Sequence, residues 1–461
     1  MTPKLTKLLS LTAAGLLCSL LAVAQPRLPA NYFWKKLPNG LEIVVIENSK
    51  VPLATIEIAV KNGAYTEGPE YSGLSHLFEH MFFKANKDYP TQELFLKRVR
   101  ELGSGDLWNG TTGNERVNYY FTLGKDSLAA GLKLLNASTR FPIYREEDMV
   151  KERPVVDGEF QRNESSPGFQ LYYQINKDLW GDLITRKMPI GIHEIINTAT
   201  PEKMMIIKDK YYLPNNSLLI ICGDVKHDNA FKQAEAIFGD WKSSGEDPNV
   251  KYPIPPFPAL DKSVAFVKES SIARTPFAMY AWQGPAYMTD SAATVAVDVF
   301  SKITDLNSSK LQQALIDKGL ASSVSFTYST SHYKGLMYMF VVPNPNKLKE
   351  CNDEVQNQLS QWGNADYYTD EQLADAKAIL LRDNSRSKEK PSSLPSQLSY
   401  QWCSTSLNYY TDLTSNYQKV TRADIAKFIN TYIKGKPMVS GLILTPELNK
   451  TVNANAFFVA K

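Results

Sequence analysis

Two histidines and a glutamate in the segment His76-Leu77-Phe78-Glu79-His80 have the types and the spacing needed for metal chemistry. His76 and His80 are four residues apart, so on a helix both imidazoles lie on one face, one turn from each other. The carboxylate of Glu79 would then lie beside a bound ion without ligating it. Zinc at catalytic sites typically has three protein ligands and a water molecule. The segment therefore predicts a zinc site that still needs a third protein ligand.

The alternative is that this spacing arose by chance. The chain has only five histidines in 461 residues, so a complete His-x-x-Glu-His arrangement is rare in a random sequence. Apolar residues between positions 74 and 82 also supply the buried face that such a helix needs. The other histidines, His193, His227 and His332, stand alone in the sequence, and we expect them to be surface or structural residues.

A third ligand could come from the segment Glu152-Arg153-Pro154-Val155-Val156-Asp157-Gly158-Glu159. Its two terminal glutamates are seven residues apart, which is two turns of a helix, so both would face the same way. Many other carboxylates are available in the chain, and a solvated acidic helix face explains the spacing equally well. The residues alone leave both interpretations open.

The chain is too long for one core, since single cores stop growing at roughly 250–300 residues, and it contains a repeat. Thr200 and Thr421, each a candidate N-cap, lie 221 residues apart, and each precedes a helical stretch and then an apolar strand. The same offset relates Gly63 to Gly284, and each of these glycines follows a predicted strand. Agreement at both ends indicates an internal duplication.

In each half the strands come first, then helices, then a strand, and this order favours an α+β fold with two similar layered domains. Strands are predicted at 41–46 and 55–60, and at 263–267 and 276–281 in the second half. Helices are predicted at 92–102 and 370–382, after the possible caps Thr91 and Thr369. A proline-rich linker at 247–261 separates an N-terminal domain, 25–246, from a C-terminal domain, 262–461.

Residues 1–24 are typical of a secretory signal peptide, with Lys4 and Lys7 before an apolar stretch and Ala22-Val23-Ala24 as the cleavage site. An uncleaved anchor and a lipoprotein processed at Cys18 are weaker alternatives. We therefore expect a periplasmic or secreted protein without a stable membrane span after cleavage. The net charge of +3 gives no indication of nucleic-acid binding. The three cysteines outside the leader have no spacing typical of a disulfide framework, and Cys222 is expected to be buried.

These features resemble the pitrilysin family of zinc peptidases, which includes insulin-degrading enzyme and the mitochondrial processing peptidases. The resemblance covers nearly the whole chain after the leader, in the segments Leu37-Pro38-Asn39-Gly40-Leu41, Ser72-Gly73-Leu74-Ser75-His76-Leu77-Phe78-Glu79-His80-Met81-Phe82-Phe83-Lys84, Glu152 to Glu159, Asn215-Asn216-Ser217-Leu218 and Gly223-Asp224-Val225.

The resemblance implies a zinc endopeptidase that binds one zinc ion through His76, His80 and Glu159. Glu79 is implied as the general base that takes a proton from the zinc-bound water and later passes it to the leaving amine. Glu152, the other acidic position, is implied to support the site and is grouped with Glu79 among the catalytic candidates. Family members bind extended peptides along a sheet edge. Here that edge is expected at Trp108-Asn109-Gly110-Thr111-Thr112, with Asn109, Gly110 and Thr111 as the substrate-binding candidates.

The C-terminal half departs from the family pattern at two places. Positions matching the three motif residues hold Val297, Phe300 and Ser301, so this half should bind no zinc. Active family members also use an arginine and a tyrosine to hold the substrate carbonyl, and here Ile316 (or Leu315) and Ser322 stand in their places. We therefore expect a heterodimer in which a related subunit supplies the arginine and the tyrosine. The alternative function is a non-catalytic structural or assembly subunit of the same family.

Overall fold

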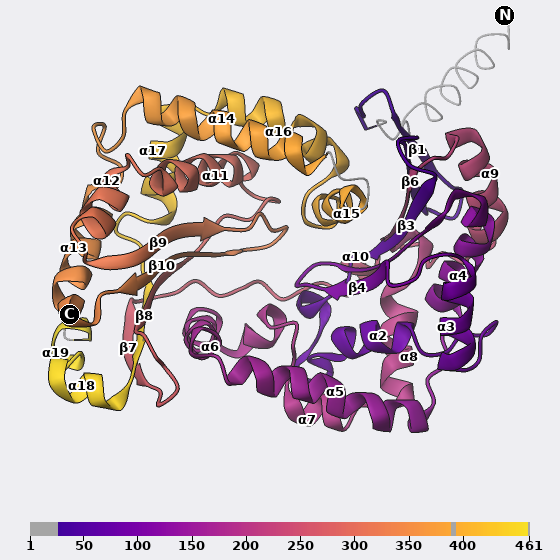
Figure 1. Cartoon of the computed structure of the whole chain (residues 1–461), viewed down its shortest axis with the longest axis horizontal. Helices are drawn as coiled ribbons and strands as arrows, with labels where there is room; N and C mark the ends of the chain where they lie inside the picture. Colours follow the sequence, from indigo (N-terminus) through magenta and orange to yellow (C-terminus); the bar gives the residue numbers. More distant parts are fainter. Residues whose placement is uncertain (1–25, 389–392, 460–461) are drawn as a thin grey trace, which may run out of the picture.

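The computed structural model describes residues 26–388 and 393–459, and it contains two β-sheets with helices around them (Figure 1). The predicted signal peptide lies outside the described residues. The N-terminal sheet occupies one side of the view and the C-terminal sheet the other. This arrangement confirms the predicted α+β class with two similar domains.

The N-terminal sheet has six strands in the order β1-β2-β6-β3-β5-β4. Strands β2 and β6 pair in parallel, and every other neighbouring pair is antiparallel. Strand β4 is therefore an edge strand with β5 as its only partner in the sheet. The strands are β1 (Tyr32–Lys36), β2 (Glu42–Glu47), β3 (Leu53–Val60), β4 (Trp108–Thr112), β5 (Val117–Gly124) and β6 (Ser217–Gly223).

The C-terminal sheet has five strands in the order β7-β11-β8-β10-β9. Its one parallel pair is β7 with β11, which matches β2 with β6 in the first sheet, and its edge strand β9 matches β4. The strands are β7 (Val264–Glu269), β8 (Phe277–Gln283), β9 (Ala321–Tyr328), β10 (Leu336–Pro343) and β11 (Val439–Leu444). Strands β2 to β6 of the first sheet and β7 to β11 of the second thus have the same topology, which confirms the duplication predicted from the sequence.

The helices also repeat between the halves, and their N-caps are those expected from the sequence. The side chains of Thr200 and Thr421 accept backbone hydrogen bonds at the first turns of α8 and α17. The helices of the N-terminal half are α2 (Leu74–Phe82), α3 (Gln92–Glu101), α4 (Leu128–Arg140), α5 (Glu146–Glu164), α6 (Pro167–Trp180), α7 (His193–Asn197), α8 (Pro201–Tyr211) and α9 (His227–Phe238). Those that follow are α10 (Pro248–Lys251), α11 (Ser291–Asp305), α12 (Lys310–Gln312), α13 (Leu348–Gln361), α14 (Asp370–Ser387), α15 (Leu394–Ser404), α16 (Leu407–Lys419), α17 (Arg422–Tyr432), α18 (Pro446–Val452) and α19 (Asn455–Phe458).

The two halves exchange one helix each. Helix α6 belongs to the N-terminal half by sequence, but Leu171 and Ile175 pack in one cluster with Met279 of the second sheet. Helix α15 comes from the C-terminal half, and its residue Leu398 packs in one cluster with Ile220 of the first sheet. Each domain therefore completes the apolar core of the other, and burial of this apolar surface favours their association.

The segment predicted as an extended linker begins with a helical turn, α10, because Asp247 accepts a hydrogen bond from the backbone N–H of Asn249 and Pro248 occupies the first helical position. From residue 252 to 261 it contains no helix or strand, as expected. The exact domain limits remain predictions. Cys222, Cys351 and Cys403 are buried free thiols, which confirms the expectation for Cys222. Within the described residues, none of the helices combines the length and the apolar character needed to cross a bilayer.

Candidate active site

The His-x-x-Glu-His segment forms helix α2, and tertiary contacts fix both the start and the buried face of this helix. The apolar face places Phe78 on the ring of Tyr212 and Phe82 on the ring of Tyr119, with centroid distances of 4.0 and 3.6 Å. The helix begins after Gly73, which has a left-handed φ of 90°. A Cβ on Gly73 would lie only 2.7 Å from the Cα of Gly191. Only glycine fits this start without strain.

Glu67 provides the cap that α2 otherwise lacks. Its buried carboxylate accepts hydrogen bonds from the backbone N–H groups of Gly73 and Ser75, at 2.7 and 2.6 Å. These N–H groups have no partner within the helix, and negative charge near a helix N-terminus is favourable. Burial raises the pKa of Glu67 to about 7, against the effect of these backbone hydrogen bonds. Glu67 thus holds the first turn of α2, directly before His76.

Helix α5 places Glu159, the predicted third ligand, beside the two histidines. Glu159 Oε2 lies 3.5 Å from His76 Nε2 and 3.9 Å from His80 Nε2. One ligand atom from each of the three residues lies within 4.8 Å of the others. In the part of the chain that the structure describes, no other group of three or more histidine, cysteine, aspartate or glutamate side chains is arranged in this way. The three could hold a metal ion together.

Glu152 lies on the other side of His80. Its Oε1 is 2.9 Å from His80 Nδ1, and its Oε2 is 2.5 Å from the ammonium of Lys84. This bond leaves His80 Nε2 directed toward Glu159, and a carboxylate in this place fixes the tautomer and the ring orientation of a metal-binding histidine. Burial raises the pKa of Glu152, but the hydrogen bonds from His80 and Lys84 outweigh burial and lower it overall. Glu152 is therefore suited to stay ionised.

The two histidines differ in their electrostatic surroundings. Burial, with the charge of His80 as a second cause, lowers the pKa of His76 to about 4, so this imidazole is neutral near pH 7. Burial also lowers the pKa of His80, but its hydrogen bond to Glu152 and the nearby carboxylates outweigh burial and raise it overall. Only a neutral imidazole binds a metal ion, so a metal would compete with a proton for His80.

Glu79 points to the edge strand β4. The hydroxyl of Thr112 donates a hydrogen bond of 2.6 Å to Glu79 Oε2. A Cβ on Gly110 would lie 2.6 Å from Glu79 Cγ, so the strand can approach this closely only because residue 110 is glycine. Burial raises the pKa of Glu79, although the hydrogen bond from Thr112 and the charge of His80 oppose this. A carboxylate with a raised pKa is a stronger general base near neutral pH.

The three substrate-binding candidates lie on this same strand. Gly110 is buried against Glu79, whereas Asn109 and Thr111 are exposed, as expected for side chains on alternating faces. Among the residues that the structure describes, strand β4 pairs with β5 on one side and with no other strand. It thus offers a free backbone edge directly beside Glu79.

Comparisons with known proteins identify the family. Residues 43–183 match the family model described as Insulinase (Peptidase family M16), and residues 198–380 match the one described as Peptidase M16 inactive domain. The chain belongs to the M16 family of peptidases. This confirms the predicted resemblance to pitrilysin and insulin-degrading enzyme. The whole His-x-x-Glu-His segment and Glu159 lie in the first matched region.

Several M16 relatives are named as zinc proteases. An uncharacterised zinc protease of Rickettsia felis is 27% identical over 219 residues, and the match covers 48% of this chain and 52% of that protein. The zinc protease PqqE of Helicobacter pylori is 23% identical over 403 residues, covering 86% and 89%. The beta subunit of the mitochondrial-processing peptidase of Saccharomyces cerevisiae is 23% identical over 416 residues, covering 87% and 89%. The chain thus spans about half of the first relative and most of the other two.

Solved M16 structures have the same fold. A protease from Helicobacter pylori superposes with a TM-score of 0.79 at 22% identity, covering 91% of this chain and 100% of that one. The periplasmic protease PqqL from Escherichia coli superposes with a TM-score of 0.75 at 15% identity, covering 94% of this chain and 50% of that one. At these identities the likeness shows the fold alone.

Three residues of this M16 site were not found by sequence reasoning: Glu67, Lys84 and Thr112. Lys84 had a usable signal, because it lies four residues after His80 and eight after His76, on the same side of a continued helix. Thr112 ends the predicted edge strand, but nothing in the sequence pairs it with Glu79. Glu67 precedes α2 by a loop, and only the folded backbone shows that its carboxylate turns back to cap the helix.

In the C-terminal half of this M16 chain, apolar residues pack at positions that match the site. Val297 and Phe300 on α11 are fully buried, and the ring of Phe300 lies 4.9 Å from that of Trp362. Leu373 and Leu380 of α14, seven residues apart like Glu152 and Glu159, pack in the same cluster. Apolar side chains thus occupy the positions in this half that match His76, Glu79 and the two glutamates of α5.

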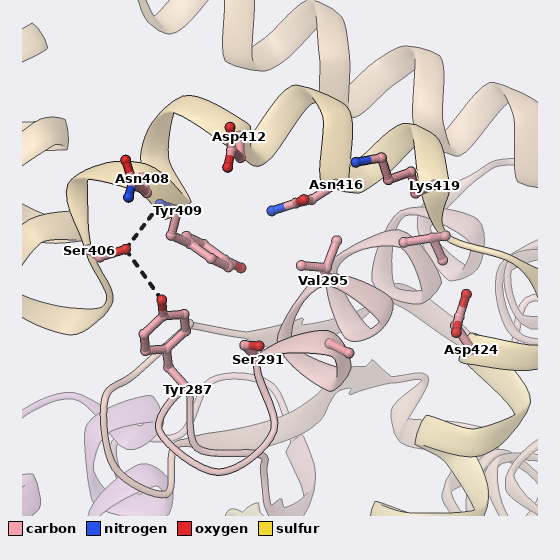
Figure 2. Close-up of a pocket in the computed structure, with 12 residues that line it drawn as sticks. Tyr287, Ser291, Val295, Ser406, Asn408, Tyr409, Asp412, Asn416, Lys419 and Asp424 are labelled. Carbon is pink, nitrogen blue, oxygen red and sulfur yellow. Dashed lines mark hydrogen bonds between the residues drawn. The ribbon is translucent and has the colours of Figure 1, made fainter. Parts of the chain in front are cut away.

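A separate pocket of about 410 Å³ lies in this C-terminal half, between α11 and α16 (Figure 2). Ser406 accepts a hydrogen bond from the backbone of Tyr409 and lies 3.3 Å from the hydroxyl of Tyr287. Two carboxylates at the pocket already have partners: Asp412 pairs with Arg27, and Asp424 accepts a hydrogen bond from the backbone N–H of Thr421, the N-cap of α17. These polar groups therefore have structural partners in the helices and loops around the pocket.

Proposed function

We propose that the chain is a zinc-dependent endopeptidase centred on His76, Glu79, His80 and Glu159. The observation that supports this is the group formed by two imidazoles and one carboxylate, beside which lies the half-buried carboxylate of Glu79, outside the group. Two nitrogens and an oxygen are donors that zinc prefers. Ligands ~2.1 Å from zinc in a tetrahedron lie roughly 3.4 Å apart, and Glu159 Oε2 lies 3.5 Å from His76 Nε2 and 3.9 Å from His80 Nε2, so a small adjustment of the side chains would close the group around the ion. The residues therefore fit the ion.

Zinc, when bound, lowers the pKa of its water ligand and polarises the scissile carbonyl. His76, His80 and Glu159 would hold the ion, and Glu152 and Lys84 would keep His80 in its binding orientation. Glu79 would take a proton from the attacking water at one carboxylate oxygen, while Thr112 holds the other oxygen in place. Glu79 would later give this proton to the leaving amine.

The substrate in this proposal is a peptide or an unfolded segment in extended conformation. It would pair with the free edge of β4 at Asn109, Gly110 and Thr111, and main-chain hydrogen bonds would supply most of the affinity. Main-chain pairing gives little selectivity for the substrate sequence, but it requires that the bound segment be unfolded.

We further propose a periplasmic or secreted location for the chain. The predicted leader supports this location, and so does the shared fold with PqqL, which is described as a periplasmic protease. Cell fractionation with an antibody against the chain measures it, and the chain should appear with the periplasmic or secreted proteins. Recovery of the chain only from the cytoplasmic fraction would contradict this location.

Metal removal tests the proposed function. The tagged chain is isolated with its natural partners and assayed for cleavage of an unfolded polypeptide. A chelator should abolish this cleavage, because the water would no longer be activated. Added zinc should restore it. Cleavage products are identified by mass spectrometry. A chain that retains zinc but cleaves no polypeptide, even with its partners present, would instead support the alternative of a non-catalytic subunit.

We also propose that a related subunit completes the site. The positions expected to carry the carbonyl-binding arginine and tyrosine hold Ile316, in a π-helical turn, and Ser322, at the start of the edge strand β9. Neither side chain can supply a cationic or phenolic donor. The relative in Saccharomyces cerevisiae, named as a beta subunit, supports a multi-subunit arrangement.

Activity of the isolated chain measures this dependence. Hydrolysis by the pure chain should be slower than that of the partnered complex by roughly 10²–10³-fold, which is the usual cost of removing one donor to the reacting oxygen. A mixing experiment with the copurifying subunit, in its natural form and with its arginine replaced by alanine, separates this role from mere stabilisation. Full activity of the pure chain would contradict the proposal.

A further inference from the structure

The turn between β4 and β5 connects the free sheet edge to the C-terminal half. Glu115 in this turn accepts two hydrogen bonds from the other domain, from the backbone N–H of His332 at 2.9 Å and from that of Tyr333 at 3.1 Å. His332 and Tyr333 lie in the connection between β9 and β10. The carboxylate is thus bound to the backbone of the domain that has lost its own metal site.

Arg116, the next residue, contacts helix α15 of the C-terminal half. Its guanidinium donates to the backbone carbonyl of Ser396, to Ser396 Oγ at 3.2 Å and to Ser399 Oγ at 2.9 Å. The same guanidinium donates to the hydroxyl of Thr111 on β4, at 3.2 Å. One side chain therefore joins the edge strand to α15.

Ser399 extends this connection to the centre of the first sheet. Its hydroxyl donates to the carboxylate of Glu57, which lies on β3 and is only 1% exposed. The positive charge of Arg116 faces this buried carboxylate and acts against the effect of its burial. Arg116 therefore has both a hydrogen-bonding role and a charge-balancing role.

From these contacts we infer that Glu115 and Arg116 are positioning residues, through which the C-terminal half fixes the place of β4 relative to Glu79. This inference rests on the proposed peptidase function. Strand β4 has a single strand partner and passes Glu79 so closely that not even a Cβ fits at Gly110. A peptide that pairs with β4 is placed against Glu79 by the strand itself, and a misplacement of about 1 Å can cost roughly 10²-fold in rate. The inactive domain thus acts on catalysis by holding the substrate edge.

The competing explanation is that the two residues only keep the domains together. Gln283 provides a matched control, because its side-chain amide also joins the halves, donating to the carbonyls of Leu179 and Pro258, but it lies on β8. Arg116→Lys provides a second comparison, because it keeps the positive charge near Glu57 but cannot reproduce the forked set of hydrogen bonds.

The test compares Arg116→Ala, Glu115→Ala, Arg116→Lys and Gln283→Ala in the full chain with its partners. Arg116→Ala and Glu115→Ala should lower kcat by about 10–100-fold with less than about threefold change in KM and with unchanged zinc content. Amide hydrogen exchange of the segment 108–112 should become at least about tenfold faster, as expected when a local structure opens more easily. Arg116→Lys should give an intermediate effect, and Gln283→Ala should change neither quantity more than about twofold.

The two readouts separate this inference from the proposed function. Unchanged exchange at 108–112 in Arg116→Ala, or a loss of kcat in Gln283→Ala as large as in Arg116→Ala, would overturn the positioning role while leaving the peptidase proposal intact. If Glu79→Gln left cleavage unaffected, the proposed role of Glu79 in hydrolysis would fail, and the exchange data would still report whether Glu115 and Arg116 fix β4.

Discussion

Replacement of Glu79 by glutamine is expected to reduce peptide hydrolysis by roughly 10²–10⁴-fold, the range that a positioned general base contributes. The amide has nearly the same shape, and Gly110 leaves just enough room for the side chain at this place. It can still contact Thr112, whose hydroxyl now bonds the carboxylate at 2.6 Å. It cannot accept a proton from water, so the rate should fall while the structure persists.

The rate is measured with an unfolded polypeptide at saturating and at low concentration, so that kcat and KM are separated. Zinc content should remain that of the unaltered chain, because Glu79 is not one of the three grouped residues. Glu93, an exposed carboxylate in the first turn of α3, serves as the control, and Glu93→Gln should retain full activity. Unchanged hydrolysis by Glu79→Gln would rule out its assignment as the base.

Replacement of Glu159 by glutamine is expected to weaken zinc binding far more than the same replacement of Glu152. Glu159 is placed to bind the ion directly, at 3.5 Å from His76 Nε2. Glu152 contacts the far nitrogen of His80 and the ammonium of Lys84 instead. Mutation of a residue that hydrogen-bonds to a metal ligand typically lowers metal affinity by roughly 10–100-fold. We expect a loss of zinc affinity in this range for Glu152→Gln and a larger loss for Glu159→Gln.

Affinity is measured by competition between the chain and a chromophoric zinc chelator at fixed pH, because protons compete with the metal for the histidines. The paired variants control for each other, since both remove one carboxylate from α5. Equal losses in the two variants, or a larger loss in Glu152→Gln, would show that the roles of the two glutamates are assigned the wrong way round.

Much of the candidate site was predictable from the sequence, because the spacing of residues within one helix determines which side chains share a face. The four-residue interval of His76 and His80 and the seven-residue interval of Glu152 and Glu159 each put two side chains on one side of a helix, and α2 and α5 place them so. The threonine caps and the repeated order of elements likewise depend on short segments. The choice of Glu159 among the many carboxylates, however, required the family resemblance. The spacing of Glu152 and Glu159 alone is explained equally well by a helix whose acidic face points to solvent.

The parts that were not predictable depend on contacts between distant segments. Helices α6 and α15 each pack against the sheet of the other domain. In the sequence this is visible only as apolar residues, and packing in the helix's own domain would require such residues equally. The contacts of Glu115 with His332 and Tyr333 join residues more than two hundred positions apart. Nothing periodic marks such a pair, so a single sequence indicates neither the partner nor the burial.

Titration of zinc into the metal-free chain, with its partners present, tests the central claim most directly. Hydrolysis of an unfolded polypeptide should rise from background in proportion to added zinc and level off at about one zinc per chain, since one group of three ligands is proposed. Glu79→Gln in the same titration should bind the ion and stay near background. Hydrolysis that does not depend on zinc, or a chain that takes up no zinc, would contradict the assignment of this M16 chain as a zinc peptidase.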